Sequence, residues 1–254
     1  MFIAEDTYIQ FAQDENAQYL AREPFPHVII DNFFDAKALD GLYENFPSEE
    51  DLPWIKYDNP LERKLAFNDI SLLGDEYKAI FEGLNGKKFL TFLEKLTGFD
   101  NIIADQELIG GGLHQIKKGG KLDIHADFNI HYKTKDRRCL NLILFLNKNW
   151  EEEYGGHLEL WDRQMIKCRK KILPIFNRAV IFSTDETSYH GHPNPLECPE
   201  DWTRKSLALY YYVKNDDKRV SHSTKYMKRP EDPEDEKLEE FRKQRLIPKE
   251  RRKV

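Results

Sequence analysis

Two histidine motifs in strand-like sequence constrain the fold of this chain more than any other feature. A His-x-Asp motif, His125-Ala126-Asp127, stands at a predicted strand end. A His-x-His motif, His190-Gly191-His192, follows a stretch rich in β-branched and aromatic residues. A fold that brings two imidazoles and one carboxylate to one face, with other coordination positions left free, provides a non-haem Fe(II) site. The spacing therefore predicts a metal centre and oxidative chemistry.

An alternating segment after these motifs adds a group that suits a carboxylate. Within residues 203–210, Arg204 and Ser206 are two positions apart, so they point to the same side of a predicted strand. The guanidinium offers a fork of donors and the hydroxyl adds a third. We expect this pair to bind the distal carboxylate of a dicarboxylic acid whose other end chelates the metal.

On these residues the chain resembles the Fe(II)/2-oxoglutarate-dependent oxygenases of the prolyl-4-hydroxylase-like type. The similarity covers roughly residues 105–214, and its parts follow the order of that family. These parts are a strand and Gly-rich turn at 113–120, the metal motif at 122–127, a core strand at 138–147, a Gly-Gly-x-Leu element at 155–160 and a strand at 174–182.

The resemblance implies a mostly β fold with an α shell (α+β), in which N-terminal helices brace a double-stranded β-helix, or jelly-roll, cupin-like core. It implies that His125, Asp127 and His190 hold Fe(II) and that 2-oxoglutarate chelates the metal. The implied reaction hydroxylates an unactivated C–H bond with O2 and releases succinate and CO2, with ascorbate as a candidate reductant. Oxygenases that halogenate lack a carboxylate at the position of Asp127, so its presence favours hydroxylation.

The substrate stays open at this stage. The resemblance favours a prolyl residue or peptide, although fold likeness is weak support for a function. A small molecule such as an amino acid or a sugar is the alternative substrate. A non-catalytic sensor of 2-oxoglutarate and metal is the alternative from another class.

Either histidine of the second motif could be the distal metal ligand. In the family this ligand is commonly followed two places later by an apolar residue, usually valine. If His190 is the ligand, His192 occupies that second position and is not apolar. If His192 is the ligand, Asn194 occupies it and is not apolar either. We expect His190, because the two prolines that follow His192 are typical of a turn. His192 is then a neighbouring or loop residue.

Two further polar residues are candidates for cosubstrate binding. Gln115 lies on the strand before the metal motif, and Asn141 interrupts an otherwise apolar run, where a buried amide must find partners. Packing or solvent exposure is the alternative for each. Four more residues are expected to be structural or exposed: His114, His131, His157 and Lys64.

Other classes of site and partner find little support. Cys139, Cys168 and Cys198 are scattered singly, which argues against a zinc site or a disulfide framework and favours a reducing compartment. The glycine runs at 110–112 and 119–120 lack the features of a phosphate-binding loop. A net charge of -6 argues against a general nucleic-acid binder. Because neither a signal sequence nor an apolar span is evident, we expect a cytoplasmic protein without a membrane partner.

The rest of the chain predicts one domain with a terminal addition. Residues 1–215 are expected to form a single oxygenase domain, and 216–254 a charged extension that is partly helical. In the N-terminal part we expect a strand at 25–34, a helix capped by Asp35, a loop with Trp54 and Tyr57, and a helical region that ends at Gly98. We expect the C-terminal helix to be solvated, with a lid over the pocket or a subunit contact as alternatives.

Overall fold

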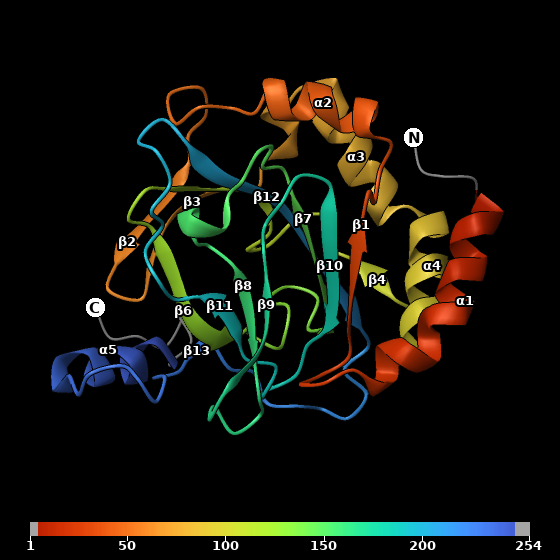
Figure 1. Cartoon of the computed structure of the whole chain (residues 1–254). Coiled ribbons are helices and arrows are strands. Elements are labelled where there is room, and N and C mark those ends of the chain that lie inside the picture. Colours follow the sequence, from red (N-terminus) through yellow and green to blue (C-terminus); the bar gives the residue numbers. More distant parts are fainter. Residues whose placement is uncertain (1–4, 247–254) are drawn as a thin grey trace.

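A computed structural model of the protein describes residues 5–246, and in these residues the strands form one curled sheet (Figure 1). Every pairing between named strands is antiparallel. The strands are β1 (His27–Asp31), β2 (Ile55–Asn59), β3 (Glu62–Phe67), β4 (Ile103–Ala104), β5 (Gly112–Lys117), β6 (Lys121–Ala126), β7 (Arg137–Phe145), β8 (Leu158–Trp161), β9 (Cys168–Ile172), β10 (Arg178–Ser183), β11 (His190–His192), β12 (Thr203–Val213) and β13 (Lys225–Tyr226).

The sheet folds back so that its two ends pack face to face. Its strand order is β1-β10-β7-β12-β5-β3-β6-β11-β8-β9, with β2 on β3, β4 on β12 and β13 on β6. Side chains from β7 and β10 at one end meet side chains from β8 and β9 at the other in one apolar cluster, which contains Phe145, Val180, Phe182, Leu158, Leu160 and Ile172. Two sheet faces that share a core form a sandwich-like barrel. The expected double-stranded β-helix is confirmed.

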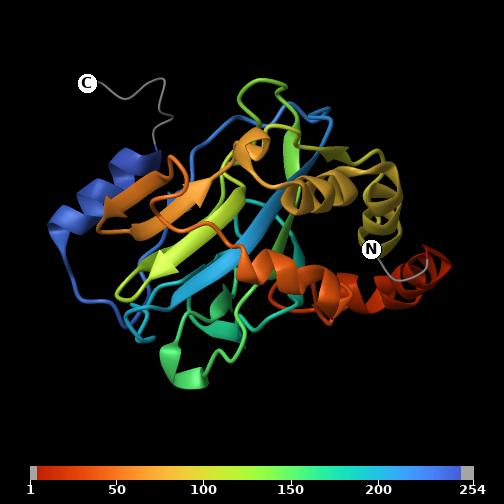
Figure 2. The same ribbon diagram turned by 90° about the horizontal axis from the view of Figure 1, so that it is seen from above.

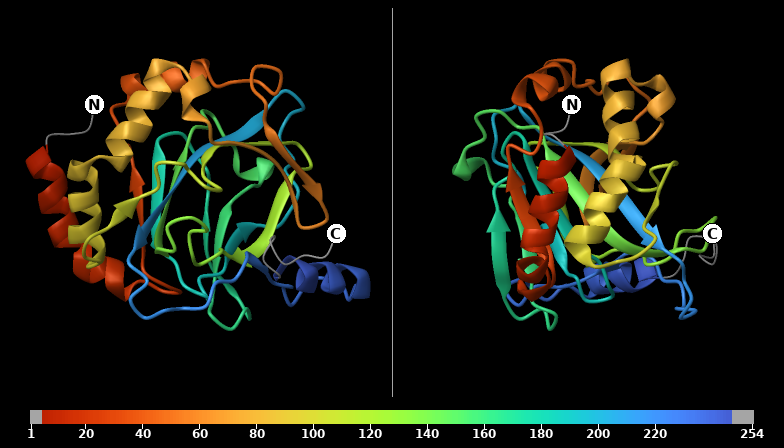
Figure 3. Two further views of the ribbon diagram at one scale, coloured as in Figure 1. Left: turned by 180° about the vertical axis from the view of Figure 1, so that it is seen from behind. Right: turned by 90° about the vertical axis from the view of Figure 1, so that its right-hand side faces the viewer.

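Helices cover the outer face of this barrel (Figures 1 and 3). They are α1 (Glu5–Ala21), α2 (Ala36–Glu44), α3 (Asp75–Asn85), α4 (Lys87–Thr97) and α5 (Glu236–Leu246), with 3-10 turns at Ile70–Leu72 and Glu152–Tyr154. The first four pack on the largest apolar cluster, to which β7 contributes Leu142 and β12 contributes Leu209. None of the helices in residues 5–246 is both long and apolar enough to cross a membrane.

Local signals explain where several elements end. Asp35 accepts a hydrogen bond from the backbone N–H of Ala38 and caps α2, as expected. Gly98 ends α4 in the left-handed region, with φ of 76°. Helix α1 was not expected from the sequence, because polar residues dominate it and only a few of its side chains, such as Ala12 and Tyr19, are buried.

A hairpin replaces the expected loop around Trp54 and Tyr57. Strands β2 and β3 form it, and β3 also pairs with β5 and β6, so the hairpin is part of the barrel wall. The side chains of Leu65 and Phe67 alternate along β3 and pack in the apolar cluster under the helices. The polar residues at the start of β3 made this alternation hard to recognise in the sequence. The expectation that Lys64 is exposed is wrong: its side chain is 13% exposed and its Nζ lies 3.7 Å from Oε2 of Glu62.

The C-terminal segment packs against the barrel instead of extending into solvent as expected (Figure 2). Strand β13 pairs with β6, with Tyr226 opposite His125. In α5, Arg242 is buried, with Nη2 3.4 Å from Oδ2 of Asp123, and Arg245 Nη2 lies 2.6 Å from Oε1 of Glu62. Acidic partners on β3 and β6 therefore hold this helix, and a pattern within the helix alone could not reveal them. The basic residues 249–253 lie outside the described residues.

Candidate metal centre

Strand pairing brings the His-x-Asp motif to the second histidine motif. His190 on β11 lies opposite His125 on β6, and Asp127 follows the end of β6. One donor atom from each of these three side chains lies within 4.8 Å of the others. The Nε2 atoms of His125 and His190 are 3.6 Å and 3.4 Å from the carboxylate oxygens of Asp127. Among the described residues this is a group of three donors whose spacing suits a metal ion.

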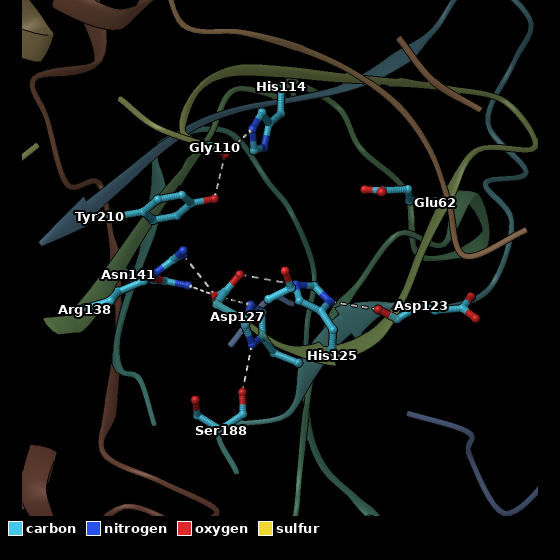
Figure 4. A network of polar contacts seen from close by, with 12 residues as sticks. Glu62, Gly110, His114, Asp123, His125, Asp127, Arg138, Asn141, Ser188 and Tyr210 are labelled. Atoms are coloured by element: carbon cyan, nitrogen blue, oxygen red, sulfur yellow. Dashed lines mark hydrogen bonds and ion pairs between the residues drawn. The ribbon is translucent and has the colours of Figure 1, made fainter. Parts of the chain in front are cut away.

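Backbone carbonyls orient both imidazoles toward the shared centre. Nδ1 of His125 is 2.8 Å from the carbonyl oxygen of Asp123 (Figure 4). Nδ1 of His190 is 2.9 Å from the carbonyl oxygen of Ser188. A carbonyl only accepts hydrogen bonds, so Nδ1 of each ring carries the proton and donates it. The lone pair of each Nε2 is then free. Metal-binding histidines commonly have this second hydrogen bond.

A cation and an amide fix the carboxylate of Asp127. Arg138 Nη2 donates to Oδ2 of Asp127 at 3.0 Å, and Asn141 Nδ2 donates to the same oxygen at 2.8 Å (Figure 4). Burial would raise the pKa of Asp127, but Arg138 and the two imidazoles outweigh burial and hold this pKa well below its usual range. The side chain is therefore a carboxylate with Oδ1 directed at His125.

The two histidines of β11 differ sharply in their surroundings. Burial, and next the neighbouring His125, lower the pKa of His190 to about 4, so this ring is neutral at physiological pH. His192 is equally buried, but neither of its ring nitrogens has a hydrogen-bond partner among the described residues. Burial, and next the charge of Arg204, lower the pKa of His192 well below its usual value. The structure groups His190, and not His192, with the other two donors.

Arg204 and Ser206 lie on the barrel-interior face of β12, as their alternation predicts. They pair with Ile116 and His114 of β5, and the guanidinium of Arg204 lies over the ring of Phe145. Arg204 is 4% exposed, and its Nε donates to the carbonyl oxygen of Gly156 at 2.7 Å. Burial lowers the pKa of Arg204 to about 9. No carboxylate in residues 5–246 forms an ion pair with this buried cation.

The Gly-Gly-x-Leu element makes room for that arginine. Gly156 has φ of 71°, and a Cβ there would lie 2.9 Å from Cδ of Arg204 and 2.6 Å from Cδ2 of Leu196. A side chain at this position would collide with the arginine or push it away. Glycine is therefore required both for the backbone conformation and for the position of the guanidinium.

The structure gives the other two cosubstrate candidates different partners. Gln115 lies on the helix-covered face of β5, where its Nε2 donates to the carbonyl oxygen of Pro47 at 3.4 Å and its Oε1 accepts from Thr203. Because strand residues alternate, its neighbour His114 takes the interior face instead. This placement argues against the role expected for Gln115. Asn141 faces the interior as expected, but its amide binds Asp127 and Arg138.

Two interior residues near the site, His114 and Tyr210, were not singled out as site residues by the sequence. His114 and Tyr210 both contact the carbonyl oxygen of Gly110, at 3.2 Å and 2.9 Å (Figure 4). Burial, and next the charge of Lys64, lower the pKa of His114 to about 3. The alternation that placed Arg204 and Ser206 also places Tyr210 on the same face, so this signal was present. Outside the site, His131 pairs with Asp105 and His157 with Glu152, which agrees with the structural roles expected of them.

Comparisons with known proteins agree with this geometry. A model of the 2OG-Fe(II) oxygenase superfamily matches residues 111–212, a range that contains all three donors and Arg204. Prolyl 3-hydroxylase OGFOD1 of Mus musculus is 24% identical over 198 residues, which are 76% of this chain and 34% of that protein. This chain therefore spans about a third of the length of that curated relative.

Two solved structures illustrate the likeness of fold. A prolyl hydroxylase of Trichoplax adhaerens, in complex with a hypoxia inducible factor oxygen degradation domain peptide fragment, has a TM-score of 0.55 and 17% identity over 82% of this chain and 91% of that chain. HygX of Streptomyces hygroscopicus, with nickel, 2-oxoglutarate and hygromycin B bound, has a TM-score of 0.52 and 11% identity over 79% of this chain and 87% of that chain. At these identities the likeness bears on the fold.

Proposed function

We propose that this chain, which a model of the 2OG-Fe(II) oxygenase superfamily matches over residues 111–212, belongs to that superfamily. We propose that it is an Fe(II)- and 2-oxoglutarate-dependent dioxygenase that hydroxylates an unactivated C–H bond. The observation that carries this proposal is the trio His125, Asp127 and His190, with donor atoms within 4.8 Å. Two imidazoles and a carboxylate on one face form the ligand set of non-haem Fe(II) oxygenases and leave coordination positions for other ligands.

The proposed metal site draws support from its neighbours. The Nδ1 bonds of both histidines aim their Nε2 atoms at the centre, and Arg138 and Asn141 hold Asp127 ionised and in place. The neutral ring of His190 and the ionised Asp127 are ready to bind a cation without releasing protons first. These residues fit a divalent iron in their donor type, protonation and spacing.

The proposed cosubstrate site rests on Arg204. A buried guanidinium without an anionic partner is costly, and a carboxylate offsets that cost through charge-assisted hydrogen bonds. Ser206, on the same face, adds a hydroxyl donor. A dicarboxylic acid such as 2-oxoglutarate fits, because one end can bind Arg204 while the other reaches the metal.

Iron and 2-oxoglutarate together supply the oxidising power for C–H hydroxylation, with O2 consumed and succinate and CO2 released. The contribution of the protein is to orient the groups and to shield them from water. Phe182, whose ring centre is 4.7 Å from that of His190, and Phe145 under Arg204 provide apolar walls for this purpose.

For the substrate we propose a peptidyl prolyl residue. OGFOD1, which covers three quarters of this chain in the alignment, is a prolyl 3-hydroxylase, and the Trichoplax structure is a prolyl hydroxylase with a peptide bound. A small-molecule substrate is the second candidate, because HygX, which shares the fold, was solved with hygromycin B.

Anaerobic titration with Fe(II) and 2-oxoglutarate tests the proposed function. We expect the visible charge-transfer band of the metal chelate, and succinate formation once O2 and a substrate are supplied. A panel of proline-containing peptides, free amino acids and sugars then separates the two substrate classes by the acceleration of succinate release. A wild-type protein without the band and without binding of 2-oxoglutarate would refute the proposal. A band without substrate-dependent succinate across the panel would favour the sensor alternative.

A further inference from the structure

The buried side chain of His192 lacks the hydrogen bonds that a buried imidazole needs. It is 3% exposed, and both Nδ1 and Nε2 are without a partner among the described residues. Buried polar side chains in folded proteins almost always have a partner, and one left without any points to a ligand or a water. The other histidines of the centre, His125 and His190, each have a carbonyl partner.

The position of His192 connects the metal centre with Arg204. His192 is two residues beyond His190 on β11, a step of about 7 Å along an extended strand. The chain then continues to Leu196, which lies against Gly156, the residue whose carbonyl binds Arg204. His192 therefore lies next to the metal ligand on β11 and also near the buried cation.

The charges around His192 favour an anion at this place. The cationic side chains of Arg204 and Lys64 lie near the ring of His192, together with His125 and His114. An imidazole always carries at least one ring N–H, so His192 has a donor to offer to a neighbour. The only carboxylate paired with Lys64 in the described residues is that of Glu62, and Arg204 has none. A bound carboxylate can accept from the guanidinium and the imidazole together.

We propose that His192 donates its ring N–H to the distal carboxylate of 2-oxoglutarate beside Arg204, and so helps to select a dicarboxylic cosubstrate. This inference rests on the proposed function. It assigns a role to a buried side chain that the proposed metal site does not use. His192 is accordingly a cosubstrate-binding residue and not a metal ligand.

A comparison of 2-oxoglutarate with an analogue that lacks the distal carboxylate separates a binding role of His192 from a structural one. 2-Oxopentanoate has the same carbon chain and the same chelating end as 2-oxoglutarate, but a methyl group replaces the distal carboxylate. A hydrogen bond to a charged group contributes about 1.5–3 kcal/mol, which is roughly a 10- to 100-fold change in Kd. The substitution His192→Val should therefore weaken binding of 2-oxoglutarate by about that factor. It should leave binding of 2-oxopentanoate within about 2-fold, because that ligand lacks the bond.

The experiment measures both dissociation constants anaerobically with the Fe(II)-loaded protein, from the charge-transfer band or from displacement calorimetry. The variants are His192→Val and His192→Gln, which restores an N–H donor and should recover part of the affinity for 2-oxoglutarate. The matched control is Gln115→Leu, a buried polar side chain on the opposite face of the barrel wall, which should change neither constant. His192→Gln also serves if His192→Val does not fold.

Two results would overturn the inference while the proposed function stands. In the first, the wild type shows the band, but His192→Val loses affinity for 2-oxoglutarate and 2-oxopentanoate by the same factor. Such a result would indicate general damage to the site. The other is unchanged binding of 2-oxoglutarate. Loss of Fe(II) binding itself in the His192 variants would assign the metal to His192. Absence of the band in the wild type would remove the proposed function and this inference with it.

Discussion

Arg138 reaches from β7 to Asp127 and donates a hydrogen bond from Nη2 to Oδ2 across 3.0 Å. The guanidinium lies over the ring of Tyr210, with Cζ 3.3 Å from the ring centre, and it also donates to Asn141. Both residues of the ion pair are largely buried. Removing one partner of such a pair leaves an uncompensated charge, so Arg138 controls both the ionisation and the direction of the Asp127 carboxylate.

The first prediction follows from this ion pair. Replacing Arg138 with Gln should weaken Fe(II) binding by about 10- to 100-fold, the usual effect of losing a residue that orients a metal ligand. Anaerobic Fe(II) titration measures the change. The control is Arg178→Gln, which removes the arginine of an ion pair with Asp31 on β1. Equal Fe(II) affinity in Arg138→Gln and the wild type would contradict the assigned role.

The second prediction concerns the distal metal ligand. His190→Ala should lose Fe(II) binding and the charge-transfer band, whereas His192→Ala should keep the band at saturating 2-oxoglutarate. A metal ion whose free concentration is 100 times its Kd stabilises the folded protein by about 2.7 kcal/mol. A chelator that removes the ion should therefore lower the Tm of the Fe(II)-loaded wild type. It should not change the Tm of His190→Ala. A chelator-sensitive Tm in that variant would argue for another ligand.

The third prediction tests the room that Gly156 provides. Gly156→Ala should lower stability by about 1–3 kcal/mol, because alanine is strained at a φ of 71° and its Cβ would collide with Arg204 and Leu196. It should also weaken binding of 2-oxoglutarate, since the guanidinium must move. Gly74→Ala is the control, as a Cβ there meets nothing within 4 Å. Thermal unfolding and cosubstrate titration measure the two effects, and a neutral Gly156→Ala would contradict the steric argument.

The fourth prediction tests whether the C-terminal segment supports the metal centre. The ring of Tyr226 lies 5.5 Å from that of His125, centre to centre. Tyr226→Ala should remove this support, lower stability by about 3–5 kcal/mol and weaken Fe(II) binding by about 10-fold. Tyr226→Phe keeps the ring and should keep the Fe(II) affinity. If both variants bound Fe(II) like the wild type, β13 would have no part in positioning His125.

The fifth prediction concerns pH. The pKa of His190 is about 4 in the folded protein and has its ordinary value of 6.5 when the chain unfolds. Between these values the unfolded chain binds a proton that the folded protein excludes, so the metal-free protein loses stability as pH falls from 6.5 toward 4. The loss from this group is up to about 1.4 kcal/mol per pH unit. Chemical unfolding measures the free energy of unfolding at pH 7.5 and at pH 5. The decrease between these two pH values should be smaller in His190→Gln than in the wild type. Equal losses would contradict the low pKa.

The local patterns predicted much of this architecture because each rests on neighbouring residues. Alternation in β12 placed Arg204 and Ser206 on one face, and the cap at Asp35 and the glycine at 98 marked helix ends. The order of motifs led to the barrel. Gln115 was expected at the cosubstrate because of its place before the metal motif, whereas alternation gives the interior position to its neighbour His114. The signal was present, but the choice of face depends on what covers the other side.

The sequence by itself determined the ligand types and the preference for His190, since these follow from residue identity and short spacing. The fold class came from the resemblance to the oxygenase family. Only the tertiary structure decided which partners meet across the barrel. Arg138 holds Asp127, β13 lies beside His125, and the buried ring of His192 lies near Arg204 with no hydrogen-bond partner among residues 5–246. Such contacts join strands that are distant in the chain, and no local period encodes them. The physical reason is that desolvation and charge pairing act on neighbours in space, which exist only once the sheet has closed.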